Sequence, residues 1–191
     1  MQEAGIESEN PISPLAGKTT ARLFFAIWPD AAVRDRLDEA ARALHQACGG
    51  RLTRAATIHL TLAFLGEVAL DQVETLKALA GQLQFPSFEM GVVQFGWWRR
   101  KRIVWAAPEP VPEPLKMLAE ILQARLCAAG FVVDSRPYAP HVTLVRKAGC
   151  KQMEFLAQAI GWKVDEFVLV RSVTDDKGAN YEVIGRWPLQ R

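Results

Sequence analysis

The chain has few of the residues that define several protein classes. Its 191 residues include three cysteines and three histidines, and neither sign of charge is in strong excess. Cys48, Cys127 and Cys150 are odd in number and lack Cys-x-x-Cys spacing, which argues against a disulfide framework and against a zinc knuckle. We therefore expect three reduced thiols in a cytoplasmic protein.

Long apolar runs are also missing. No stretch approaches the ~18 consecutive apolar residues of a membrane span, and residues 1–10 lack the apolar core of a signal peptide. A formal net charge of +2 is too small to indicate nucleic-acid binding by itself. Gly17-Lys18-Thr19 ends like a phosphate-binding loop, but the first glycine of that motif would fall at Ile12. These features exclude a membrane protein and a P-loop nucleotide site.

The overall composition is that of a globular domain. Half of the residues are hydrophobic and 23% are charged, and a chain of this length can bury roughly 70% of its unfolded surface. Residues 1–18 contain Pro11 and Pro14 and show no periodicity, which predicts a flexible N-terminal arm. We expect residues 19–191 to form a single two-lobed domain.

One short pattern occurs twice. Residues 58–62 read Ile-His-Leu-Thr-Leu and predict a strand with His59 and Thr61 on one face and its apolar residues on the other. The same His-x-Thr-Leu frame returns at His141 and Thr143. A lone histidine on an apolar strand is more often structural than functional. Two of three histidines in one frame instead favour a functional pair.

Apolar periodicity predicts the same order of elements twice. Strand, helix, His-x-Thr strand, helix and strand follow one another over residues 22–95 and again over 102–173, with a closing strand at 181–187. The second short helix is expected at 152–160. The two histidines are 141 − 59 = 82 residues apart, which suits two similar lobes that face each other rather than a local motif.

Two imidazoles on opposite sides of a cleft suit in-line displacement at phosphorus. One can remove a proton from the attacking oxygen while the other protonates the departing oxygen, because histidine titrates near neutral pH. Threonine hydroxyls can donate hydrogen bonds to the non-bridging phosphate oxygens. A metal site is less well supported, since no Asp, Glu or Cys stands in ligand spacing beside the histidines, and no G-x-S-x-G segment indicates a nucleophilic serine.

These residues resemble a known family. His59-Leu60-Thr61-Leu62 and His141-Val142-Thr143-Leu144 are similar to the paired HxTx motifs of the 2H phosphoesterases. Within that superfamily the chain resembles the RNA 2′,3′-cyclic phosphodiesterases, also called 2′–5′ RNA ligase-like proteins. The resemblance extends to residues 22–27, 59–68 and 140–146, and to Tyr181 and Trp187. It implies an α+β fold, bilobal, with a pseudo-twofold pair of antiparallel-rich sheets flanking a central groove and helices on the outside.

The same resemblance implies a role for each residue of the motif. His59 is the proton donor to the O3′ leaving group and His141 the proton acceptor that activates water, so the product is a 2′-phosphomonoester. Thr61 and Thr143 hold the phosphate, and no cofactor or metal is required. The two motifs alone do not distinguish the acid from the base. Arg146 returns to the His141 face and either adds positive charge to the groove or forms a salt bridge at its rim.

Several alternatives stay open. The chain could act on another cyclic or bridged nucleotide, could join RNA ends through a 2′–5′ bond, or could bind nucleotides or RNA without turnover. Residues 97–102 read Trp-Trp-Arg-Arg-Lys-Arg, which fits either a nucleic-acid contact or a solvated hairpin tip with one tryptophan tucked beneath it. We favour the solvated tip. The expected partners are RNA ends or nucleotides with a 2′,3′-cyclic phosphate, with no membrane and no obligatory protein partner, and we expect a monomer.

Overall fold

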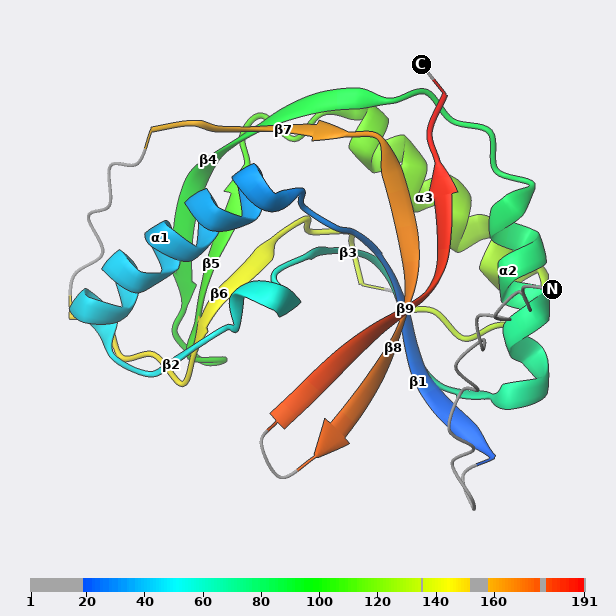
Figure 1. Ribbon diagram of the computed structural model, residues 1–191, viewed down its shortest axis with the longest axis horizontal. Coiled ribbons are helices and arrows are strands. Elements are labelled where there is room, and N and C mark those ends of the chain that lie inside the picture. The colour runs from blue at the N-terminus through cyan, green and yellow to red at the C-terminus, as the bar shows by residue number, and fades with distance from the viewer. Residues whose placement is uncertain (1–18, 135, 152–157, 176–177, 191) are drawn as a thin grey trace, which may run out of the picture.

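The computed structural model describes residues 19–134, 136–151, 158–175 and 178–190 (Figure 1). Within these ranges, nine strands form one curled antiparallel sheet in the order β7-β4-β5-β6-β3-β1-β8-β9, and β2 pairs with β6 off this path. The strands are β1 Thr20–Ile27, β2 Arg51–Leu52, β3 Leu60–Ala69, β4 Phe88–Trp98, β5 Ile103–Pro108, β6 Val142–Arg146, β7 Ile160–Val164, β8 Glu166–Asp175 and β9 Gly178–Pro188.

Three α-helices are present in the part of the chain that the structure describes: α1 Ala31–Cys48, α2 Val73–Gly81 and α3 Glu113–Ala128. Short 3-10 turns, η1 Ala55–Thr57 and η2 Leu70–Gln72, precede β3 and α2. Asp30 caps α1, because its Oδ1 accepts a hydrogen bond of 2.8 Å from the Val33 N–H. None of the described helices is long and apolar enough to cross a membrane.

The sheet is divided into two lobes. One lobe holds β7, β4, β5 and β6, and the other holds β3, β1, β8 and β9. A single residue pair in the β3–β6 ladder, Leu60 opposite Val142, joins the two lobes into one sheet. The expected bilobal α+β fold is therefore confirmed, with the two antiparallel halves continuous at one narrow junction instead of separate.

The two halves of the sequence exchange elements between the lobes. The first half contributes β1 and β3 to one lobe, but its β4 joins the lobe of β5 and β6, and its α1 packs against β6 and β7. The second half contributes β8 to the lobe of β1, and its α3 packs against β3 (Figure 1). Each lobe is thus built from both halves of the chain.

Two predicted elements differ from the structure, and two fall partly or wholly outside it. The helix predicted at 152–160 includes residues 152–157, which lie outside the described residues, as does the predicted arm at 1–18. Ile160 begins strand β7, in which Ile160, Trp162 and Val164 are buried and the residues between them are exposed. The first half of the predicted elements ends with a strand at residue 95, but strand β4 runs on through Trp98, so the turn that follows is 99–102.

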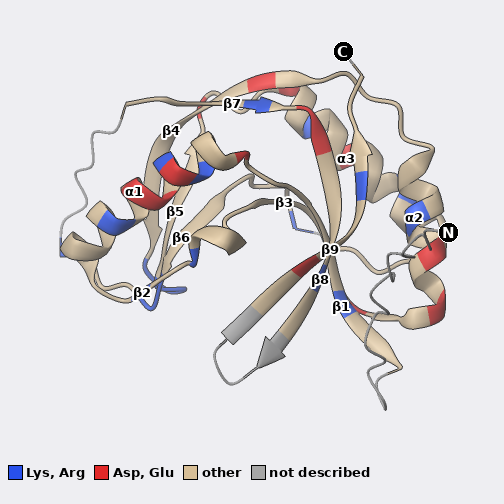
Figure 2. Cartoon of the chain, viewed as in Figure 1, with Lys and Arg blue, Asp and Glu red and all other residues tan. Residues whose placement is uncertain are grey.

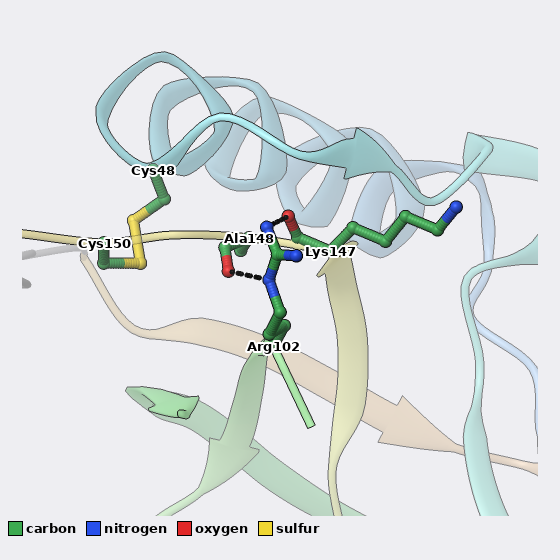
Figure 3. The surroundings of a disulfide bond; sticks show 5 residues. All are labelled: Cys48, Arg102, Lys147, Ala148 and Cys150. Atoms are coloured by element: carbon green, nitrogen blue, oxygen red, sulfur yellow. Dashed lines mark hydrogen bonds between the residues drawn. A yellow bond between two sulfur atoms is a disulfide. The ribbon is translucent and has the colours of Figure 1, made fainter. Parts of the chain in front are cut away.

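The expectation of three reduced thiols is wrong for two of them. Cys48 and Cys150 form a disulfide between residues 102 positions apart, while Cys127 is a free, exposed thiol (Figure 3). The fold brings the pair together because the end of α1 lies against the segment after β6, where the Gly149 N–H donates to the Cys48 carbonyl at 2.8 Å. Spacing along the sequence gave no sign of this tertiary contact.

Candidate active site

The β3–β6 junction positions the two predicted motifs side by side. Leu60 and Val142 pair across it and are fully buried. Because side chains alternate along extended chain, the histidine before each of these residues and the threonine after it share the opposite face. All five predicted site residues line one open cavity of about 510 Å³: His59, Thr61, His141, Thr143 and Arg146.

Both histidines are held in the same way. His59 Nδ1 lies 2.7 Å from the Thr57 carbonyl oxygen, and His141 Nδ1 lies 2.8 Å from that of Ala139, two residues upstream in each case. A carbonyl oxygen only accepts, so each Nδ1 must carry the donated proton. The neutral imidazoles therefore keep an unprotonated Nε2, which is the atom free to exchange a proton with a ligand.

An aromatic shell surrounds His59. Trp28 stacks on its ring with centroids 5.5 Å apart, while the rings of Phe24 and Tyr181 lie 4.9 and 5.3 Å away. The pKa of His59 is lowered from 6.5 to about 4, chiefly by burial, with smaller contributions from the charges of Arg146 and His141 and against the effect of the backbone hydrogen bond to Thr57. His59 is thus neutral at pH 7 in the unliganded protein.

His141 is in a more open position. The rings of Trp98 and His141 form an edge-to-face contact with their centroids 4.5 Å apart. Burial again lowers the pKa, followed by the charges of Lys101 and Arg146, while the hydrogen bond to Ala139 opposes them. The two imidazoles share a tautomer but differ in surroundings, with His59 enclosed by aromatic rings and His141 close to cations.

The threonines and Arg146 complete the polar lining. Thr61 and Thr143 are both half-buried and hence accessible to a ligand in the cavity. Arg146 is exposed, and among the described residues no acidic side chain forms a salt bridge with it. Its charge lowers the pKa of both histidines, which places it near each of them.

Other lining residues were not predicted as part of the site, and four of them contact the predicted motifs or add charge to the cavity. Trp98 and Lys101 come from the 97–102 run, which the sequence analysis favoured as a solvated tip. Tyr138 donates its hydroxyl to the Thr61 carbonyl at 3.2 Å, and burial raises the pKa of that hydroxyl and keeps it protonated. Gln123 of α3 donates to the Leu62 carbonyl at 3.1 Å. These last two have no local sequence signal, because only tertiary packing brings them to β3.

The chemistry of the cavity is that of an acid–base site for an anion. It offers two imidazoles, two hydroxyls and exposed cations, and among the described residues no group of three or more His, Cys, Asp or Glu could hold a metal ion. A curled α+β sheet with two His-x-Thr segments facing one cavity defines the two-histidine phosphoesterases as a class.

Comparison with known proteins identifies the family within that class. A family model described as LigT like Phosphoesterase matches residues 27–105. An RNA 2′,3′-cyclic phosphodiesterase of Escherichia coli (strain K12) is 34% identical over 170 residues, which cover 88% of this chain and 96% of that protein. The chain belongs to the LigT-like RNA 2′,3′-cyclic phosphodiesterase family of the 2H phosphoesterases.

Solved structures show the same fold. Escherichia coli LigT in its apo form superposes with a TM-score of 0.81 at 33% identity, over 91% of this chain and 100% of that one. LigT complexed with 3′-AMP gives a TM-score of 0.81 at 34% identity, over 90% and 99%. The similarity therefore extends over both lobes and not only over the two motifs.

Proposed function

We propose that the protein hydrolyses RNA 2′,3′-cyclic phosphodiester ends to 2′-phosphomonoesters without a metal ion. The observation that carries this proposal is the pair of equally tethered imidazoles, His59 and His141, that line one cavity. The names of the relatives and their similarity over nearly the whole chain support the substrate.

In the proposed reaction, water attacks phosphorus and the bond from phosphorus to O3′ breaks. His141 Nε2 takes a proton from the water, and His59 Nε2 gives one to O3′, which leaves as the 3′ hydroxyl. Thr61 and Thr143 donate hydrogen bonds to the non-bridging oxygens, and Arg146 adds charge stabilisation as negative charge redistributes in the transition state. Each positioned acid or base contributes ~10²–10⁴-fold to the rate.

Binding of the anionic substrate favours protonation of His59, the proposed proton donor. Burial keeps His59 neutral in the unliganded protein, yet a proton donor must be protonated when the substrate is in place. A phosphate anion beside the imidazole favours the charged form and raises its pKa. Binding of the substrate is therefore coupled to protonation of His59. The positive charge on the imidazole is stabilised in the substrate complex and not in the unliganded protein.

The direct test uses a nucleoside 2′,3′-cyclic phosphate in the presence of EDTA. His59→Ala and His141→Ala should each lower kcat by about 10²–10⁴-fold. His45→Ala is the matched control, because this third histidine lies on α1, a helix that is described throughout and lines none of the cavity. Full activity in either site variant, or loss of wild-type activity in EDTA, contradicts the mechanism.

A second candidate is the hydrolysis of a small cyclic or bridged nucleotide in place of an RNA end. The complex of Escherichia coli LigT with 3′-AMP favours it, because a single nucleotide binds to that relative. Product analysis on mononucleotides and on RNA ends separates the two candidates. The same assay detects 2′–5′ ligation, and binding of 3′-AMP with no product from any substrate would indicate a nucleotide-binding module instead.

We also propose that the protein acts as a monomer in the cytoplasm, with no obligatory protein partner. One chain supplies both histidines, both threonines and Arg146, so the cavity needs no residue from a second copy. RNA ends are its expected substrates, which supports an internal compartment. Size-exclusion chromatography with light scattering tests the first statement, and cell fractionation tests the second.

A further inference from the structure

Three chain segments without acidic residues meet at one end of the β5–β6–β2 ladder. No Asp or Glu lies between Glu39 and Glu67, between Glu89 and Glu109, or between Asp134 and Glu154. The ladder places Ile103 of β5 and Arg51 of β2 on either side of Arg146. Figure 2 shows Lys and Arg side by side where the β4–β5 turn reaches the ends of these strands.

Five exposed cations at this end form what we call the basic ledge: Arg51, Arg99, Arg100, Lys101 and Lys147. Within the described part of the chain, no acidic side chain forms a salt bridge with any of them. Several cations on the helices do have acidic partners, as in Arg42 with Asp38 and Lys77 with Glu74, each at 2.8 Å. A concentrated positive surface without internal neutralisation attracts polyanions.

The basic ledge continues directly into the cavity. Lys101 belongs to both, since it lines the cavity together with Arg146. Its Nζ lies 5.0 Å from the centroid of the Trp98 ring, and the edge of that ring contacts His141. Asp134 also lines the cavity, and its pKa is lowered chiefly by Arg136 and to a smaller extent by the charge of Lys101. Its salt bridge is with Arg136 and not with a cation of the basic ledge.

The turn that carries the basic ledge is held firmly. Arg102 donates from Nε to the Ala148 carbonyl at 3.3 Å and from Nη2 to the Lys147 carbonyl at 3.0 Å, and its own carbonyl accepts from the Ala148 N–H at 2.9 Å. The Cys48–Cys150 disulfide fastens the same segment to α1 (Figure 3). A ligand that binds there meets side chains on an ordered backbone, which reduces the entropy lost on binding.

A 2′,3′-cyclic phosphate stands at the 3′ end of an RNA, so the remainder of the strand must leave the cavity from the 5′ side of that nucleotide. We propose that this single-stranded RNA runs over the basic ledge, with its phosphates contacting Arg99 and Arg100 and then Lys147 or Arg51. The proposal rests on the proposed function and adds to it: the preferred substrate is an oligonucleotide end and not a free nucleotide.

The test compares two substrates that differ only in the upstream strand: a short oligoribonucleotide and a mononucleoside, each ending in a 2′,3′-cyclic phosphate. Wild type should have the higher kcat/KM on the oligonucleotide. The double variant Arg99→Ala with Arg100→Ala should lower that value about tenfold, the size of one charge-assisted hydrogen bond. The mononucleotide value should stay unchanged, since neither arginine lines the cavity in the described structure.

Salt dependence gives a second readout. Each single-strand phosphate contact contributes about 0.7 to the slope of log kcat/KM against log salt, so losing two contacts should reduce the slope by about 1.4. The double variant Arg99→Lys with Arg100→Lys keeps both charges and should keep most of the wild-type salt slope. Arg34→Ala with Arg42→Ala on α1 is the matched control for lost charge and should leave the oligonucleotide value unchanged.

Three results would overturn the proposed RNA path. They are equal kcat/KM for the two substrates in wild type, equal losses of kcat/KM on both substrates in the Arg99→Ala with Arg100→Ala variant, and a salt slope that this variant leaves unchanged. If wild type hydrolyses neither substrate, the proposed function fails and the basic ledge is judged by fluorescence anisotropy with a 3′-phosphorylated oligoribonucleotide. Affinity that is unaffected by Arg99→Ala with Arg100→Ala then overturns it, and weaker binding supports it.

Discussion

At the scale of single residues, two histidines with the same backbone tether lie in unlike surroundings. Each Nδ1 is held by the carbonyl two residues before it, so the backbone that leads into each strand selects the tautomer. Only the neighbours differ: three aromatic rings enclose His59, while Trp98 and cations lie near His141. The division of labour between donor and acceptor therefore depends on packing and charge and not on the duplicated motif.

The lowered pKa values predict an acidic optimum for kcat/KM. Acid–base catalysis needs one imidazole protonated and one neutral, so the profile peaks between the two macroscopic pKa values of the unliganded protein, whichever histidine donates. These are about 4 for His59 and below the ordinary 6.5 for His141. We expect kcat/KM to peak below pH 6.5 and to fall as the pH rises towards 8.

The profile of kcat should lie at higher pH, because the bound phosphate raises both pKa values. Trp28→Ala would hydrate the ring of His59 and raise its pKa, and should therefore move the acidic limb of the kcat/KM profile to higher pH. A kcat/KM maximum above pH 7 for wild type would contradict the buried, neutral histidines seen here.

At this scale the sequence predicted which polar residues of the two motifs share a face, but not the residues from other segments that pack around them. Alternation along a strand was enough to place His59 with Thr61 and His141 with Thr143, and the cavity contains all four. Tyr138 and Gln123 could not be found in this way, because each reaches β3 from a distant segment and contacts only its backbone carbonyls. Their side chains carry no periodic signal.

At the scale of elements, the connection after α1 depends on one close approach. Gly50 has a φ of +96°, and a Cβ there would meet the Arg146 carbonyl oxygen at 2.6 Å and the Ala148 nitrogen at 2.9 Å. Both contacts are to backbone, so no side chain can move aside. The close approach at Gly50 therefore determines how tightly β2 lies against the end of β6.

Gly50→Ala should destabilise the protein by roughly 2–4 kcal/mol, the sum of a left-handed conformation and a backbone collision. Gly49→Ala is the control: its φ of +59° and ψ of −157° lie in a region that is essentially restricted to glycine, but nothing lies within 4 Å of the added Cβ, so only a conformational cost of roughly 1–3 kcal/mol applies. Urea denaturation of both variants measures the difference. Equal losses of stability in the two variants would show that the backbone from Arg146 to Ala148 moves easily to accommodate a Cβ at position 50.

Prediction of secondary structure failed for β7, where the alternating pattern of apolar residues is short. β7 spans only five residues and follows segment 152–157, so its alternation was read as the end of a helix. The longer helices have caps or sustained periodicity and were predicted correctly, as with Asp30 before α1. The hairpin of β4 with β5 was predicted from its tip at 97–102 and is confirmed. The second partner of β4 was harder to predict, because nothing local in β4 indicates that it also pairs with β7 in the lobe of His141.

At the scale of the whole molecule, the Cys48–Cys150 disulfide closes a loop that contains both histidine strands. A chain-entropy estimate for a loop of ~100 residues gives up to about 4.7 kcal/mol of stabilisation. Dithiothreitol should therefore lower the melting temperature of wild type to that of Cys48→Ser with Cys150→Ser. Cys127→Ser is the control, since this free thiol is exposed and its loss should change nothing. A wild-type melt that is insensitive to dithiothreitol argues against the bond in solution.

The exchange of elements between the lobes has a consequence for how such a protein could be divided. A cut between α2 and β4 gives an N-terminal fragment with His59 and a C-terminal fragment with His141. The first has α1 but not the β6 and β7 that α1 covers, and the second has α3 but not β3. Each fragment exposes an apolar face that only the other can bury, so activity should return on mixing and in neither fragment alone. The motif is duplicated along the sequence, but each lobe can form only when both halves of the chain are present.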